Sequence, residues 1–195
     1  CDELKKREEW QKLAYVMFTY STGCRRAETR QLLKEVIGYE PKRKYITVPD
    51  ENGIDTQIES ISYKTHDIRC KGRSRAGKVR KLQFGKDVMD IFKKWIVVRE
   101  NDDCPYMFVI KQKNNGSVRQ VSENTFNDWC SGLFTKIIGR RVHPHLFRAS
   151  RATNLVVHEH KALETAQKLL GHESSETTQI YVVREDDGDA DEAFI

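Results

Sequence analysis

The chain has 195 residues, of which 38% are hydrophobic and 32% are charged, and a net charge of +5. That length predicts a single domain with enough apolar residues to bury a core under a heavily charged surface. No apolar run is long enough to cross a membrane and there is no signal peptide, so we expect a cytoplasmic protein. The five cysteines have scattered spacings and no C-x-x-C pair, which argues against a zinc site.

The positive charge lies before residue 185. Residues 185–195 hold six acids and no base, so residues 1–184 carry 34 basic and 23 acidic residues, a net charge of +11. A body that basic suggests a nucleic acid as partner, although spare lysines on an ordinary soluble protein would give the same count. We read 185–195 as an acidic tail that DNA phosphates would repel. The chain has no initiator Met and begins almost inside its first predicted helix, which suggests a fragment of a longer protein.

Residues 4–20 predict a helix with an apolar face, and the Ser21-Thr22-Gly23 turn ends it. A second helix is predicted from Cys24, with Leu32, Leu33 and Val36 facing inward. Arg25 would lie near the start of that helix, beside free backbone N–H groups, where an anion could bind. A surface arginine without a ligand is the alternative.

Residues 44–84 are typical of strands and turns rather than of helices. We expect one small antiparallel sheet with a basic hairpin, whose turn spans residues 71–77. The stretch from Asn52 to Lys64 is too long for a single hairpin in this interpretation. The strand segments expected from the sequence are 44–48, 58–63, 65–70 and 78–84.

Two further amphipathic helices follow. In residues 86–99 the apolar side chains recur at helical spacing, and we expect all of Val88, Ile91, Phe92, Trp95 and Val98 in the core. Residues 106–110 form an apolar run, and a turn is expected at residues 114–116. Ser122 caps a helix that ends at Gly139. The pair Arg140 and Arg141 fits contact with a nucleic-acid backbone or a solvated face equally well.

The stretch 143–181 predicts helix, turn, helix, turn and short helix. Pro144 suits a first helical turn, and His145 and Arg148 project from nearly the same face. The second helix stops at Gly171, directly before His172. Ser174 or Ser175 would cap the third helix, which carries Tyr181. Cations near helix starts favour phosphate and a tyrosine hydroxyl can act as a nucleophile, but a helical core segment with ordinary polar side chains would contain the same residue types.

The spacing of these residues resembles the tyrosine recombinase (phage integrase) family. The likeness rests on His145-x-x-Arg148, on Leu-Leu-Gly-His at 169–172, on Thr-Thr-x-x-Tyr at 177–181 and on Thr-Gly-x-Arg-x-x-Glu at 22–28, and it covers about residues 13–183. It implies an α+β fold: a mainly α-helical catalytic domain, residues 1–184 here, with a small antiparallel β-sheet. The resemblance also implies a catalytic lysine in the basic hairpin, which Lys71 fits, with Lys78 as the reserve candidate.

The resemblance implies a mechanism that needs neither metal nor cofactor. Tyr181 would attack a DNA phosphate to form a 3′-phosphotyrosine, while Arg25, Arg148 and His172 hold the non-bridging oxygens. Lys71 would protonate the leaving 5′-oxygen and His145 would assist proton transfer at the tyrosine. The implied partners are double-stranded DNA and further copies of the chain, as a tetramer in the synapse. Other expected DNA contacts are Arg26, Arg73, Arg75, Lys78, Arg140, Arg141 and Arg151.

Arg151 departs from the family pattern, which usually has an apolar or aromatic residue at that position. An additional phosphate contact and a salt bridge to an acid both remain open for it. Two other functions also remain open for the chain: a type IB topoisomerase-like nicking and closing enzyme with the same residues, and a non-catalytic DNA-binding module of the same fold. The element order argues against the first, and the presence of Tyr181 and both arginines argues against the second.

Overall fold

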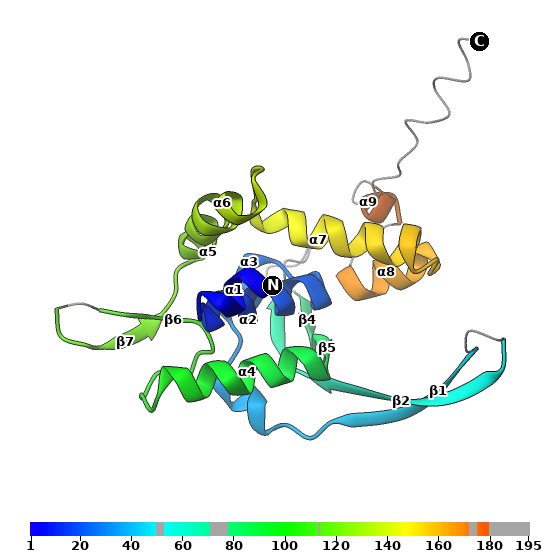
Figure 1. Cartoon of the computed structure of the whole chain (residues 1–195), viewed down its shortest axis with the longest axis horizontal. Coiled ribbons are helices and arrows are strands. Elements are labelled where there is room, and N and C mark those ends of the chain that lie inside the picture. Colours follow the sequence, from blue (N-terminus) through cyan, green and yellow to red (C-terminus); the bar gives the residue numbers. More distant parts are fainter. Residues whose placement is uncertain (50–52, 71–77, 113, 172–174, 180–195) are drawn as a thin grey trace, which may run out of the picture.

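The computed structural model of the chain describes residues 1–49, 53–70, 78–112, 114–171 and 175–179. The helix α2 lies at the centre, packed against α4 on one side and against α7 on the other, and β-hairpins extend from this body (Figure 1). No helix among the described residues is long and apolar enough to span a membrane. The α-helices are α1 (Asp2–Lys6), α2 (Trp10–Thr22), α3 (Arg26–Arg30), α4 (Lys86–Arg99), α5 (Glu123–Trp129), α6 (Thr135–Ile138), α7 (Pro144–Thr153), α8 (Leu163–Leu170) and α9 (Ser175–Gln179), with a 3-10 helix η1 (Lys34–Gly38) and π-helical turns η2 (Cys130–Phe134) and η3 (Asn154–His158).

Among the described residues, the strands form three small antiparallel sheets rather than the one predicted. The orders are β1-β2-β5, β3-β4 and β6-β7. β1 pairs along its whole length with residues 55–62 of β2, from Lys42 opposite Ser62 to Pro49 opposite Asp55. Residues 55–64 of the stretch that seemed too long for a single hairpin therefore form one continuous strand. The strands are β1 (Lys42–Pro49), β2 (Asp55–Lys64), β3 (Ile68–Cys70), β4 (Lys78–Arg80), β5 (Gln83–Gly85), β6 (Val109–Lys111) and β7 (Val118–Gln120).

The predicted strand 78–84 is wrong, because the chain changes sheets at Leu82. Leu82 is buried, its backbone N–H donates to the Thr65 hydroxyl oxygen and its carbonyl oxygen accepts the Thr65 N–H, both at 2.9 Å. These bonds end the pairing of β4 with β3 and direct β5 onto β2. Tertiary hydrogen bonds therefore outweigh the continuous strand pattern of the sequence.

The predicted N-terminal helices are also shorter than expected. The helix expected over 4–20 is divided into α1 and α2 at Glu8, which has a positive φ of 56°. The helix expected from Cys24 is reduced to α3, since the backbone beyond it pairs with a distant segment. The Met107 N–H donates to the Leu32 carbonyl oxygen at 2.7 Å, and Lys34 donates to the Pro105 carbonyl oxygen at the same distance. The buried positions predicted at Leu32 and Val36 are nevertheless confirmed.

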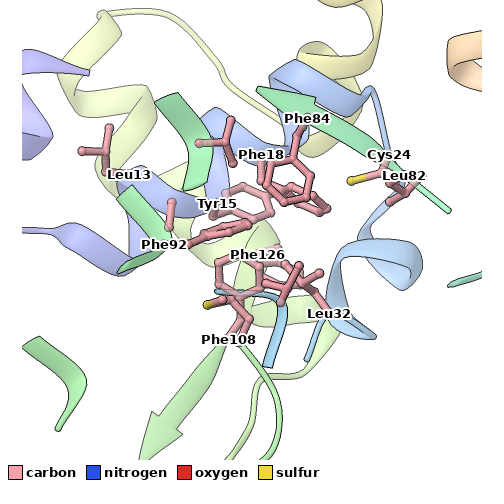
Figure 2. Packing of buried hydrophobic residues seen from close by; sticks show 14 of the residues in the cluster. Leu13, Tyr15, Phe18, Cys24, Leu32, Leu82, Phe84, Phe92, Phe108 and Phe126 are labelled. Carbon is pink, nitrogen blue, oxygen red and sulfur yellow. The ribbon is translucent and has the colours of Figure 1, made fainter. Parts of the chain in front are cut away.

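The core is built around aromatic side chains of α2 (Figure 2). The ring of Tyr15 stacks on Phe126 with centroids 4.6 Å apart and meets Phe108 edge to face. Helix α4 has the predicted bounds and buries Phe92 completely, but Val98 is 45% exposed. Val98 lies six residues after Phe92, about 120° round the helix, which explains why it leaves the apolar face.

Candidate active site

The turn between α2 and α3 places Arg25 at the start of a helix. Thr22 ends α2, its hydroxyl donating to the Phe18 carbonyl oxygen at 2.7 Å, and Gly23 follows with a left-handed φ of +60°. A Cβ on Gly23 would lie 2.3 Å from a methyl carbon of Leu170. The backbone conformation and the close approach of α8 therefore both require glycine. Arg25 then takes the N-cap position of α3, as predicted.

Glu28 holds Arg25 from the first turn of α3. Its carboxylate accepts from the Arg25 backbone N–H at 3.2 Å and from the Arg25 guanidinium at 3.1 Å. The same carboxylate also accepts from the guanidinium of Arg80 at 2.9 Å. The Glu28 side chain is only 1% exposed. Burial raises the pKa of this carboxyl, but Arg80 and then Arg25 outweigh burial and hold the pKa below its usual value of 4.5. Glu28 is therefore ionised at neutral pH.

Arg80 also lies in this site, and the sequence interpretation did not single it out. Its Nε donates to the Cys70 sulfur at 3.2 Å, Nη1 to the Leu169 carbonyl oxygen at 2.6 Å and Nη2 to Glu28. A signal for it exists in the strand pattern, because Arg80 pairs with buried Ile68 and so shares the inward face of the β3-β4 hairpin. An arginine on the inward face of a strand has to find buried acceptors.

Arg148 connects segments that are far apart in the sequence. It lies on α7 and is 1% exposed. Its Nη1 donates to the Gly23 carbonyl oxygen, and its Nη2 donates to the Leu170 carbonyl oxygen at 2.8 Å. One guanidinium thus joins the turn before Arg25 to the end of α8, and this brings two of the predicted motifs together.

The C-terminal end of α8 is capped by arginines. The carbonyl oxygens of Leu169 and Leu170, in the last turn of the helix, accept from Arg80 and Arg148 respectively. Gly171 ends α8 with φ +68°, as the sequence predicts. A Cβ at this position would lie 2.8 Å from Nη1 of Arg80. His172 and Tyr181 lie outside the described residues, and the last described helix, α9, ends at Gln179.

His145 stands one turn before Arg148 on α7 and is exposed. Partial desolvation of the imidazole, followed by the positive charges of Arg26 and Arg148, lowers its pKa below the usual 6.5; His143 and Arg25 act in the same direction. The neighbouring positive charges thus lower the pKa of His145 in addition to desolvation. His145 is neutral at physiological pH.

The basic hairpin is described only at its base, so Lys71, Arg73 and Arg75 lie outside the described residues. Lys78 is exposed at the start of β4, opposite Cys70. It lines a shallow depression of about 380 Å³ between the hairpin and α8, together with Lys168 and Gly171. The reserve lysine therefore faces the same depression as Gly171, the residue that precedes His172.

The remaining predicted DNA contacts are distributed over several surfaces. Arg26 is partly buried near His145, whereas Arg140 and Arg141 are exposed. Arg151 donates to Glu159 at 2.6 Å and lies over the Tyr20 ring at 5.9 Å. Of its two open interpretations, the structure therefore shows the salt bridge. Within the described part of the chain, no three His, Cys, Asp or Glu side chains are grouped as they would be around a metal ion.

The chain matches the model of the phage integrase family over residues 1–187. It belongs to that family. The match includes every motif on which the resemblance was based. Through Arg148 and Arg80 the fold places the motifs at 22–28, at 145–148 and at 169–171 in contact.

Relatives within the phage integrase family cover the chain to different extents. The SPbeta prophage-derived recombinase-like protein YomM of Bacillus subtilis (strain 168) is 28% identical over 197 residues, which is 100% of this chain and 53% of the relative. Tyrosine recombinase XerC of Shewanella sp. (strain ANA-3) is 31% identical over 127 residues, or 64% of this chain and 40% of the relative. The chain thus spans about half the length of the curated relatives that it matches.

Solved structures confirm the fold of the chain. The crystal structure of XerA recombinase superposes with a TM-score of 0.65 at 20% identity, covering 95% of this chain and 56% of that one. XerH site-specific recombinase bound to palindromic difH substrate gives a TM-score of 0.61 at 19% identity, covering 100% and 47%. The predicted α+β class, mainly helical with small antiparallel sheets, is confirmed.

Proposed function

We propose that this chain is the catalytic part of a site-specific DNA recombinase or integrase that cleaves and rejoins DNA through a 3′-phosphotyrosine. The observation that supports this most is the double contact of Arg148, which joins the turn before Arg25 to the α8 end that leads to His172. Membership of the phage integrase family and relatives named as recombinases point the same way. In this proposal residues 1–184 are the catalytic domain and residues 185–195 an acidic tail.

In the proposed reaction the Tyr181 oxygen attacks phosphorus and the bond from phosphorus to the 5′-oxygen breaks. Lys71 gives the leaving oxygen its proton, and His145, which is neutral, accepts the tyrosine proton. Arg25, Arg148 and His172 stabilise the charge that develops on the non-bridging oxygens. Because Arg148 is 1% exposed, its contact with a phosphate requires the groups that cover it to move aside.

The proposed partner is double-stranded DNA, with further copies of the chain as a tetramer in the synapse. The net charge of +11 on residues 1–184 suits a polyanion. Among the structural relatives, XerH was solved on its difH substrate and the Tn1549 transposon integrase on transposon right-end DNA. Phosphate contacts from Arg26, Lys78, Arg140 and Arg141 belong to the same proposal.

Covalent trapping tests the proposal directly. The protein is incubated with a nicked duplex selected by binding to it from a random-sequence pool, and the products are denatured in SDS. Wild type should form a protein–DNA adduct, whereas Tyr181→Phe should bind the same duplex and form none, because only the hydroxyl is removed. An adduct with the Phe variant would assign the nucleophile elsewhere. Binding by wild type without an adduct would favour a non-catalytic module.

We also propose that cleavage is independent of metal, since guanidinium and imidazole groups can supply the electrostatic stabilisation. Adduct formation should then proceed at the same rate in EDTA as in Mg²⁺ at matched ionic strength. A strict requirement for Mg²⁺ would contradict this mechanism. Relaxation of supercoiled DNA without strand exchange between two sites would instead indicate a nicking and closing enzyme.

A further inference from the structure

Arg80 lies at the junction of three segments that carry proposed catalytic groups. It donates to Glu28, the carboxylate that also holds Arg25. It donates to the Leu169 carbonyl oxygen at the end of α8, and to the sulfur of Cys70, the residue before Lys71. The three acceptors belong to α3, α8 and β3, which are far apart in the sequence.

The geometry suits a fixed support better than a DNA contact. The Arg80 side chain is 15% exposed, and each of its three nitrogens donates to a different buried or backbone acceptor at 2.6 to 3.2 Å. Gly171 adds a steric constraint, because a Cβ there would come within 2.8 to 3.3 Å of Nη1, Cζ and Nε of the guanidinium. The planar fork of arginine can meet three acceptors in fixed directions, which a lysine ammonium cannot.

We propose that Arg80 is a positioning residue, which sets Arg25, the α8 end before His172 and the hairpin that carries Lys71 in register with one another. It does so without touching DNA. This inference rests on the proposed function, because the groups it positions act only if the chain cleaves DNA. A displacement of about 1 Å at such groups can cost about 100-fold in rate while binding is kept.

Two variants remove the support in different ways. Arg80→Lys keeps the positive charge beside Glu28 but loses the fork. The double variant Glu28→Gln with Arg80→Gln removes both charges of the Glu28–Arg80 pair. It leaves Arg25 without its carboxylate, but Arg25 is 29% exposed, so the variant should fold. Lys81→Gln is the matched control, since it removes one charge from the exposed neighbouring residue.

The measurements are the dissociation constant for the selected nicked duplex, the single-turnover rate of adduct formation at saturating duplex, and the melting temperature. We expect both Arg80 variants to bind within about threefold of wild type and to form the adduct about 100-fold more slowly. Lys81→Gln should keep the wild-type rate at saturation. An Arg80→Lys variant with the wild-type rate would overturn the inference, and so would parallel losses of binding and melting temperature, which would assign Arg80 to the fold alone.

A modified substrate tests the link to the hairpin. A 5′-bridging sulfur in place of the 5′-oxygen leaves as a thiolate and needs no proton, so it bypasses the proton donor. Cys70→Val removes the sulfur acceptor of Arg80, and with it the weak bond from that sulfur to the Ile68 carbonyl oxygen. We expect this variant to be slow on the ordinary phosphodiester and to recover on the sulfur-containing duplex. Equal slowing on both duplexes would exclude the positioning of a proton donor. Absence of an adduct with wild type on either duplex would instead refute the proposed function.

Discussion

Removal of the Glu28 carboxylate should destabilise the protein strongly. In Glu28→Ala the guanidinium of Arg80 loses its ionic partner in a site where the carboxylate is 1% exposed, and α3 loses its capping box. Loss of one partner of a buried ion pair costs about 3 to 5 kcal/mol. Arg80 is itself 15% exposed and keeps its bonds to Leu169 and Cys70, so we expect the lower end, about 3 kcal/mol.

Thermal unfolding followed by circular dichroism measures this effect. For a protein of this size, about 3 kcal/mol corresponds to a fall of about 6 to 12 °C in melting temperature. Asp90→Ala is the matched control, because its pair with Lys86 is more than half exposed on both sides and its loss should therefore change the melting temperature little. A melting temperature for Glu28→Ala as close to wild type as that of Asp90→Ala would refute the reasoning.

The effect of Glu28 should also depend on pH. Its pKa in the folded protein lies below the usual 4.5, so the stabilisation is complete above about 4.5 and is lost as the pH falls through the lower, folded-state value. The difference in melting temperature between wild type and Glu28→Gln should therefore be largest near neutral pH and shrink in acid. A difference that stays constant from neutral pH into strong acid would show that shape, rather than charge, holds the site.

Two further predictions concern packing. Gly171→Ala should lower the melting temperature by at least about 2 to 4 °C, because Ala at φ +68° is strained and its Cβ meets a guanidinium, whereas Gly38→Ala, with open space around it, should change it little. In urea unfolding, Phe92→Ala should cost about 3 to 5 kcal/mol, and the same truncation at Val98 about 0.5 kcal/mol or less.

Helix ends were predictable because they depend on chemistry within a few residues. Gly139 and Gly171 stop helices in the left-handed conformation, and Ser122 caps α5 by accepting the Thr125 N–H at 3.2 Å. Each of these features needs only a residue type and its immediate neighbours. The same local signals, together with the motif spacing of the family, predicted Arg25 near the start of a helix and Arg148 on the helix that begins at Pro144.

The parts that could not be predicted depend on contacts between distant residues. The helix expected after Arg30 gives way to pairing between Leu32 and Met107, and the strand expected over 78–84 gives way to the bonds between Leu82 and Thr65. Arg80 was missed for the same reason, since its acceptors on Glu28 and Leu169 are 52 and 89 residues away. No local pattern in the sequence encodes these partners.

The lowered pKa of His145 reports a positive field that a phosphate should cancel. Partial desolvation lowers the pKa first, and Arg26 and Arg148 lower it further. If the arginines bind a phosphate oxygen, a bound dianion should raise the His145 titration midpoint towards 6.5, and Arg26→Gln should raise it without an anion. Imidazole signals followed by NMR in sulfate, against sodium chloride of equal ionic strength, separate binding from screening. If neither sulfate nor Arg26→Gln moves the midpoint, desolvation alone sets it, and the described arginines do not form the phosphate site.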